Sequence, residues 1–199
     1  MKDIKKVKFF DSKALGWDWR NHPDDKSQIQ KLVNRFFLKP KELVLDIGTG
    51  NGVLLPYLSI KVKPGGIILA LDFSWSMIAL AKKNNPKRNL GFLNASAEAL
   101  PIKDQKLDCI TCFSAFAHVC DKIESLKEMA RVLKKGGRLY IAHPFGKKEL
   151  AHHHKTAGGV VKHDTLPSDL LMKKTMMRSG LKNVRIIDRS DLYLASAQK

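Results

Sequence analysis

Short apolar runs alternate with helical repeats along most of the chain. Continuous apolar runs at 43–47, 67–72, 90–94, 108–113 and 139–142 predict strands that are buried on both faces. Apolar residues recur at helical spacing near 53–58, 74–83 and 121–133, and an earlier helix, capped by Asp24 or Asp25, is predicted to run to Pro40. Five such alternations predict an α/β domain with a parallel sheet, which binds ligands at the carboxyl ends of its strands.

The pattern changes after residue 142. Residues 143–166 are rich in histidine and contain Gly158-Gly159. A helix is predicted from about Pro167 to Ser179, followed by strands at 184–187 and 192–195 that are close enough to pair as an antiparallel hairpin. The last third of the chain therefore has a different organisation from the first two thirds.

Composition narrows the class of protein. With 199 residues, 44% hydrophobic and 28% charged, the chain has the size and balance of one globular domain. No apolar run approaches the roughly 20 residues of a membrane span, and no apolar segment typical of a leader follows Met1. The three cysteines are an odd number, which disfavours disulfides and predicts a cytoplasmic location. Cys109 and Cys112 fit a strand core, and Cys120 lies beyond it.

The net charge of +17 has two interpretations. It can be the footprint of a nucleic-acid binder, because Lys and Arg neutralise phosphates. However, 28 of the 36 basic residues are lysines spread over the whole length. We therefore favour a solvated lysine-rich surface, and nucleic acid stays the alternative.

A glycine-rich turn follows the first predicted strand, at Gly48-Thr49-Gly50-Asn51-Gly52. Glycine permits a positive φ and leaves no side chain between the backbone and a ligand. The spacing differs from the Gly-x-Gly-x-x-Gly of dinucleotide sites, and a purely structural turn is the alternative. Asp72 ends the second strand, where a carboxylate can accept both hydroxyls of a ribose. Phe73 and Met77 can enclose an adenine, although Met77 also suits the core.

Five segments in order carry a family resemblance: 43–58, Asp72-Phe73-Ser74-x-x-Met77, 97–102, 107–110 and 131–137. Together they resemble the motifs of class I S-adenosylmethionine-dependent methyltransferases, in the subgroup similar to the ubiquinone/menaquinone C-methyltransferases (methyltransferase type 11). The match covers roughly residues 40–143. The resemblance implies a Rossmann-like sheet of seven strands in the order 3-2-1-4-5-7-6, with strand 7 antiparallel. It also implies S-adenosyl-L-methionine as the cofactor and S-adenosyl-L-homocysteine as the product.

The resemblance assigns the cofactor site. The glycine turn would hold the methionine and ribose, Asp72 the ribose hydroxyls, and the Ala97 backbone the adenine. The family often has an acid just before this alanine, where the chain has Ser96. The predicted cofactor residues are Asp46, Gly48, Thr49, Gly50, Gly52, Asp72, Phe73, Met77, Ser96, Ala97 and Phe113. We divide the single domain, 1–199, into an N-terminal lid and helix (1–39), a cofactor-binding core (40–142), a His-rich substrate-side insertion (143–166) and a C-terminal helix and hairpin (167–199).

The acceptor of the methyl group must lie beyond strands 4 and 5. His118 follows strand 4 and can act as a base near neutral pH, with simple packing as the alternative. We expect His143, His154, His163 and Asp164 to line the acceptor site, and His154 also to serve catalysis, sharing a helix face with Leu150 if 149–155 is helical. A metal held by His143, His154 and His163, or plain surface histidines, are the alternatives. Phe9-Phe10 and Trp17 are expected to form a lid or a hydrophobic clasp.

The sequence predicts a methyltransferase that acts on a small molecule, without a membrane span. An RNA methyltransferase is the second possibility, favoured by charge. The Asn/Asp-Pro-Pro-aromatic motif of exocyclic-amine enzymes is absent after strand 4, where the chain reads Ser114-Ala115-Phe116-Ala117. A nicotinamide-dependent oxidoreductase and a regulatory domain that only senses the cofactor are further alternatives.

Overall fold

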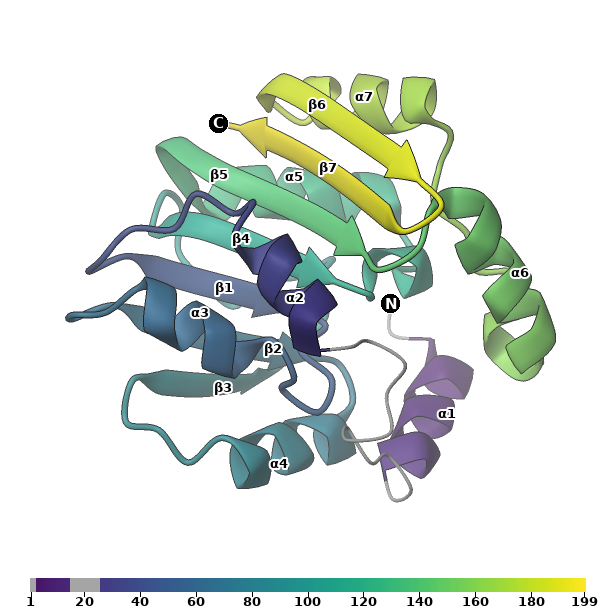
Figure 1. Cartoon of the computed structure of the whole chain (residues 1–199), viewed down its shortest axis with the longest axis horizontal. Coiled ribbons are helices and arrows are strands. Elements are labelled where there is room, and N and C mark those ends of the chain that lie inside the picture. The colour runs from purple at the N-terminus through teal and green to yellow at the C-terminus, as the bar shows by residue number, and fades with distance from the viewer. Residues whose placement is uncertain (1–2, 15–25) are drawn as a thin grey trace.

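The computed structural model describes residues 3–14 and 26–199, and its strands form one seven-stranded sheet (Figure 1). The strands are β1 Leu43–Ile47, β2 Ile67–Asp72, β3 Leu90–Asn94, β4 Leu107–Phe113, β5 Leu133–His143, β6 Lys182–Arg189 and β7 Leu192–Gln198. Their order is β3-β2-β1-β4-β5-β7-β6, with β1 to β5 parallel and β7 antiparallel to both neighbours. The predicted fold class and strand order are confirmed.

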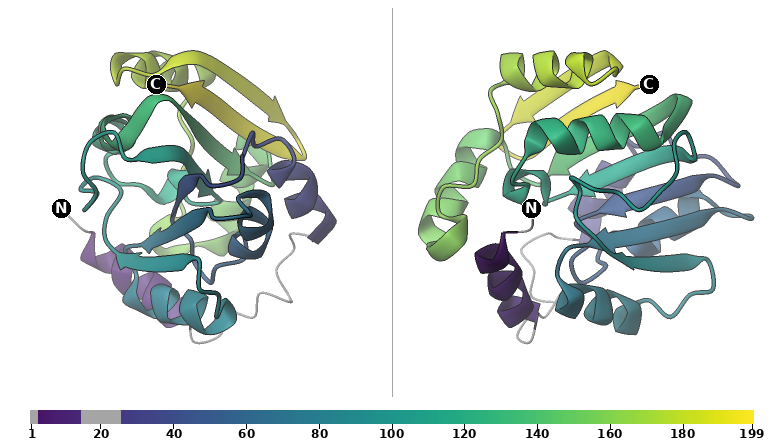
Figure 2. Two further views of the ribbon diagram at one scale, coloured as in Figure 1. Left: turned by 90° about the vertical axis from the view of Figure 1, so that its left-hand side faces the viewer. Right: turned by 180° about the vertical axis from the view of Figure 1, so that it is seen from behind.

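Helices cover both faces of the sheet (Figures 1 and 2). Helices α2 (Lys26–Val33) and α3 (Leu55–Lys61) lie on one face, and α5 (Lys122–Val132) and α7 (Asp169–Arg178) lie on the other. Helix α4 (Trp75–Asn84) packs against β2 and β3. Two apolar layers result, one containing Leu55 and Ile68 and the other Leu126 and Ile110. Burial on both faces explains why the central strands are continuous apolar runs.

Two further helices flank the end of the sheet at which the parallel strands finish (Figure 1). Helix α1 (Ile4–Ala14) packs against α4 and against a short 3₁₀ turn at Gly159–Val161. Helix α6 (Lys147–Ala157) follows β5, and a second 3₁₀ turn, Phe116–His118, follows β4. The sequence therefore places α1, α6 and both turns around the edge where ligands bind in this architecture.

Three predicted boundaries are wrong. The helix expected to run to Pro40 ends at Val33, because Phe36 turns back to stack on Tyr140 with ring centroids 4.8 Å apart. Leu133 belongs to β5 and not to the preceding helix, and β5 includes Gly136. Residues 143–166 contain α6, so the β/α alternation continues where we expected it to break. The predicted Asp24 or Asp25 cap lies outside the described residues.

The cysteines follow the prediction from sequence. Cys109 and Cys112 are buried in β4, Cys120 is exposed, and all three are free thiols. None of the helices in residues 3–14 and 26–199 has both the length and the apolar character that crossing a membrane requires.

Candidate functional site

The turn after β1 needs glycine for two different reasons. All three of its glycines have positive φ, 68° at Gly48, 53° at Gly50 and 81° at Gly52. A Cβ on Gly48 would lie 2.2 Å from the Cβ of Ala115, so this position has no room for a side chain. A Cβ on Gly50 would meet nothing within 4 Å. Gly50 therefore leaves open space beside the backbone, whereas Gly48 allows the turn to approach the β4 exit.

Two buried carboxylates stand beside this turn. Asp72 accepts the backbone N–H groups of Gly50 and Ser74, both at 2.9 Å. Asp46 accepts the hydroxyl of Thr111 at 2.7 Å. Burial raises the pKa of each carboxyl to about 6, against the lowering effect of these hydrogen bonds. Asp72 thus ties the glycine turn to the start of α4, a structural role that the sequence did not reveal.

Two adjoining cavities form a cleft at these strand ends. They share Gly48, Phe73, Ala115 and His118, and enclose about 730 Å³ beside the glycine turn and about 530 Å³ beside residues 95–98. Ten of the eleven predicted cofactor residues line one cavity or the other. The exception is Gly52, where a Cβ would instead meet Asn85 and Leu55 behind the turn.

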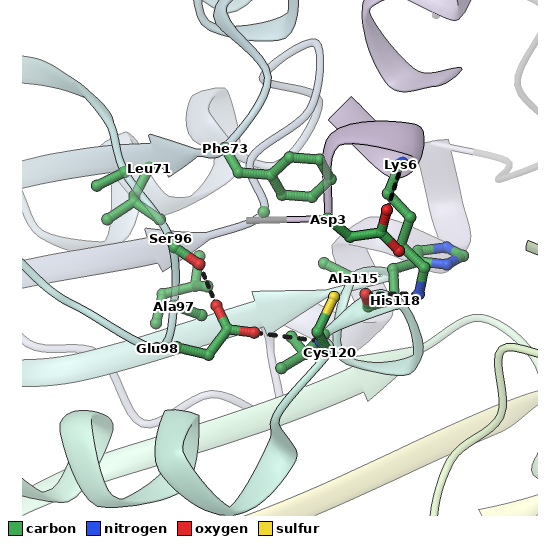
Figure 3. A pocket seen from close by; sticks show the side chains of 14 residues that line it. Asp3, Lys6, Leu71, Phe73, Ser96, Ala97, Glu98, Ala115, His118 and Cys120 are labelled. Atoms are coloured by element: carbon green, nitrogen blue, oxygen red, sulfur yellow. Dashed lines mark hydrogen bonds between the residues drawn. The ribbon is translucent and has the colours of Figure 1, made fainter. Parts of the chain in front are cut away.

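The second cavity is largely apolar and is lined by two carboxylates, those of Asp3 and Glu98 (Figure 3). The hydroxyl of Ser96 donates to the carboxylate of Glu98. The other oxygen of Glu98 accepts the backbone N–H of Cys120 at 3.1 Å and of Asp121 at 3.2 Å. Glu98 thus brings a carboxylate to Ser96, at the position where the family often has an acid. Sequence reasoning missed it, although an acid displaced by two positions was the available signal.

The first cavity contains polar groups that await a ligand. Within the described residues, the side-chain nitrogen of Asn51 and the hydroxyl of Ser114 are buried without a hydrogen-bond partner. Both residues line the cavity, and Ser114 adopts a positive φ of 52°. Unsatisfied buried polar atoms and strained backbone are concentrated at ligand sites. The cleft therefore has polar groups at the glycine turn and at Asp72, and an apolar end beside Ala97.

His118 lies where the two cavities meet. Its Nδ1 is 2.8 Å from the carboxylate of Asp164, and the ammonium group of Lys6 is 2.6 Å from the other oxygen of this carboxylate. Lys6 also donates to the backbone oxygen of His118 at 3.0 Å. Burial alone would raise the pKa of Asp164, but the hydrogen bonds from His118 and Lys6 outweigh it and lower the pKa. An ionised carboxylate therefore orients the imidazole toward the cleft.

The other predicted acceptor residues divide into two groups. His154 is buried on the same face of α6 as Leu150, with its Nδ1 2.6 Å from the backbone oxygen of Asp164 and its ring 4.7 Å from that of His118. His143 is fully buried, and burial with the nearby His118 and His154 lowers its pKa to about 3, so it is neutral. His163 is exposed. The structure thus brings His118, His154 and Asp164 together and leaves His163 outside.

The three histidines considered as a metal site are not brought together in the structure. Across residues 3–14 and 26–199, no group of three or more His, Cys, Asp or Glu side chains is arranged to hold a metal ion, and the exposed His163 cannot join the buried His143 and His154. Trp17, predicted to contact the substrate, lies outside the described residues.

Helix α1 contributes Phe10, which the sequence singled out for a lid or clasp, and Lys6 and Asp11, which it did not. The ring of Phe10 lies 5.5 Å from Phe73 and 5.2 Å from His118, and lines the first cavity. Asp11 accepts the hydroxyl of Ser74 at 2.5 Å. The available signal was Asp3, whose carboxylate accepts the backbone N–H of Lys5 and caps the helix.

A sheet in this strand order, with a cleft beyond β1 and β2, is the class I methyltransferase fold. Residues 45–141 match the methyltransferase domain family. The chain is 34% identical over 149 residues to the ubiquinone/menaquinone biosynthesis C-methyltransferase UbiE of Hahella chejuensis, a match that covers 70% of this chain and 59% of that protein. The chain therefore matches about three fifths of this curated relative's length.

Solved structures share the fold over nearly the whole chain. A complex between the Trm112 methyltransferase activator of Haloferax volcanii and a protein described as a methyltransferase superposes with a TM-score of 0.79, at 21% identity over 95% of this chain and 96% of that one. A SAM-dependent methyltransferase of Aquifex aeolicus gives a TM-score of 0.70 at 24% identity, covering 99% of this chain and 98% of the other. At these identities the likeness concerns the fold alone.

Proposed function

We propose that this protein transfers a methyl group from S-adenosylmethionine to a small-molecule acceptor, with His118 as the general base. The observation that carries this proposal is the position of His118 at the junction of the two cavities, held by Asp164 at 2.8 Å. The curated relatives are C-methyltransferases of ubiquinone/menaquinone biosynthesis, which supports a small molecule as the acceptor class.

The cofactor residues divide according to the shape of the cleft. The backbone at Gly48 and Gly50 would face the methionine end, Asp72 the ribose hydroxyls, and the backbone of Ala97 the adenine. When bound, S-adenosylmethionine supplies a methyl group already activated on a sulfonium. The chain therefore contributes mainly alignment, which can supply much of the rate enhancement in a bimolecular displacement. Phe10, packed on Phe73, would exclude water from this space as the predicted lid.

His118 has the partners of an oriented base. The ionised carboxylate of Asp164 accepts a hydrogen bond from Nδ1–H, which leaves Nε2 of a neutral ring as the acceptor. A base held in one tautomer can take a proton from the acceptor as the methyl group arrives. The proton moves from the acceptor's hydroxyl, amine or activated carbon to Nε2, and Asp164 stabilises the imidazolium that forms.

We assign His154, which lies beside His118, to the wall of the acceptor pocket. His154 packs on His118, and the neutral His143 lies in the adjoining core at the end of β5. In this proposal His154 shapes the acceptor pocket through its contact with His118 and the Asp164 backbone, and His163 makes no direct contribution because it is exposed. Trp17 remains a proposed element of the lid.

An RNA acceptor is the second candidate, favoured by the net charge of +17. The experiment is to incubate the protein with methyl-labelled S-adenosylmethionine and either a metabolite extract or total RNA. Label in the small-molecule fraction, lost in His118→Asn, is the expected result. Label in RNA would show that the methyl acceptor is RNA and not a small molecule. Cofactor binding without label in either fraction would support a regulatory domain. A cytoplasmic location, supported by the three free thiols, completes the proposal.

A further inference from the structure

Basic side chains in residues 26–94 have few acidic side chains beside them. Between residues 26 and 94 the chain has eleven Lys or Arg and only three Asp or Glu. Two of these acids, Asp46 and Asp72, are buried in the cleft at the carboxyl ends of β1 and β2. The third, Glu42, forms an ion pair with Arg138. The positive charge of this half of the molecule is therefore not neutralised by its own carboxylates.

A pair of basic residues precedes each of the first three strands of the sheet. We call this set the amino edge: Lys39, Lys41, Lys61, Lys63, Lys87 and Arg88. All are exposed except Lys61, which is half-buried. Within residues 3–14 and 26–199, none of the six takes part in an ion pair.

The pairing of the strands sets these residues in a row. Leu43 pairs with Ile67 and Ile68 pairs with Leu90, so the three strand starts are side by side in the order β3, β2, β1. The row continues with Lys106 before β4 and Lys135 near the start of β5, both exposed. Five strand starts at a spacing of about 4.8 Å extend over about 19 Å. In Figure 1 these ends lie on the side opposite α1 and α6.

The row is too long for a single small anion and has the length of a polymer. A nucleic-acid strand carries one phosphate per nucleotide, at least about 3.4 Å apart along its length, so about 19 Å spans several phosphates. Lys63, Lys87 and Arg88 also line a shallow depression together with Gly65 and Gly66. A phosphodiester backbone can enter such a depression and contact all three cations.

A membrane surface fits these features less well. Basic membrane-binding surfaces combine lysines with protruding aromatic and long apolar anchors. Here the exposed apolar neighbours are Ile60, Ile67 and a single aromatic residue, Phe37, and the basic side chains surround a depression. We infer that the amino edge is a nucleic-acid-binding surface that contacts the phosphate backbone, separate from the methyl-transfer cleft. The inference is independent of the acceptor proposed above, because the two sites lie at opposite ends of the strands.

A charge-matched pair of variants tests this inference. The edge variant is Lys63→Glu/Lys87→Glu/Arg88→Glu, and the control is Lys148→Glu/Lys155→Glu/Lys162→Glu, on exposed positions in and after α6. Both change the net charge equally. Binding of a fluorescein-labelled single-stranded oligouridylate is measured by anisotropy at several salt concentrations, with anionic phosphatidylglycerol vesicles in parallel. Thermal melting and the affinity for S-adenosylhomocysteine show whether each variant is folded.

We expect the edge variant to bind RNA about tenfold more weakly, with a salt slope smaller by about 2, since each phosphate contact on a single strand contributes about 0.7. The control should stay within about twofold of the parent, and saturating S-adenosylhomocysteine should not change RNA affinity. Equal losses of RNA affinity in both variants would show that net charge alone governs binding, and would overturn the inference. A larger loss in the control would show that RNA binds on the cleft side and not at the amino edge. Binding to vesicles without binding to RNA would show that the partner of the amino edge is a membrane surface.

Discussion

Asp72→Asn tests the proposed ligand-binding role of this carboxylate beside its structural role. The substitution keeps the shape of the side chain and removes the charge. In the parent, one carboxylate oxygen accepts the N–H of Gly50 and the other accepts the N–H of Ser74. An amide can accept only one of these, so a buried N–H is left unsatisfied at a cost of about 1–3 kcal/mol of folding stability. The ribose hydroxyls would also lose a charged acceptor.

The expected loss of affinity follows from that lost charge. A hydrogen bond to a charged group contributes about 1.5–3 kcal/mol, which corresponds to about 10- to 150-fold in the dissociation constant. Calorimetric titration with S-adenosylhomocysteine measures this loss, and a thermal melt measures stability. Asp108→Asn is the control, because that carboxylate accepts the N–H of Leu43 at 2.9 Å but lies at the amino end of β4.

The same residue predicts a pH dependence. Burial raises the pKa of Asp72 in the free protein to about 6. Hydroxyls that bind the ionised form lower this pKa in the complex, so binding releases a proton and affinity rises with pH until it levels off above about pH 6. Asp46, with a pKa also raised to about 6, acts in the same direction if the cofactor's ammonium approaches it. An affinity that is independent of pH between 5 and 8, or an unchanged affinity in Asp72→Asn, would show that Asp72 does not hold the ligand.

Other variants test the base and the glycine turn. His118→Asn should lower kcat by about 10²- to 10⁴-fold with little change in cofactor affinity. Asp164→Asn should lower kcat less, and His163→Asn, at an exposed position, should leave kcat unchanged. Normal turnover in His118→Asn would show that His118 is not the base. Gly50→Ala and Gly136→Ala both place a Cβ in open space at positive φ, so each should lose about 1–2 kcal/mol of stability. Only Gly50→Ala should also lose cofactor affinity, and equal affinities in the two would place the ligand away from the turn.

The sequence predicted the sheet well because burial on both faces leaves a strong pattern. The runs that end at Ile47 and Asp72 fixed the strand ends, and the family resemblance gave the strand order. The helix after Lys26 was extended too far because Phe36 and Phe37 continue its spacing, while packing turns Phe36 onto Tyr140. Local pattern cannot show such a tertiary contact.

The candidate site was only partly predictable. Residues that follow strand ends, such as Asp72 and His118, share an edge by topology alone, so the sequence could locate them. Lys6 could not be located, because its contact with Asp164 joins residues 158 positions apart. His163 was grouped with its neighbour Asp164 because the sequence does not show side-chain direction. In the structure His163 is exposed, whereas the Asp164 side chain contacts His118.

The central claim is that the cleft holds S-adenosylmethionine, and competing calorimetric titrations of the purified protein test it most directly. One series uses S-adenosylmethionine and S-adenosylhomocysteine, and the other uses NAD. We expect micromolar affinity for both adenosyl-sulfur ligands and no heat from NAD. Heat from NAD, with none from either adenosyl-sulfur compound, would contradict it.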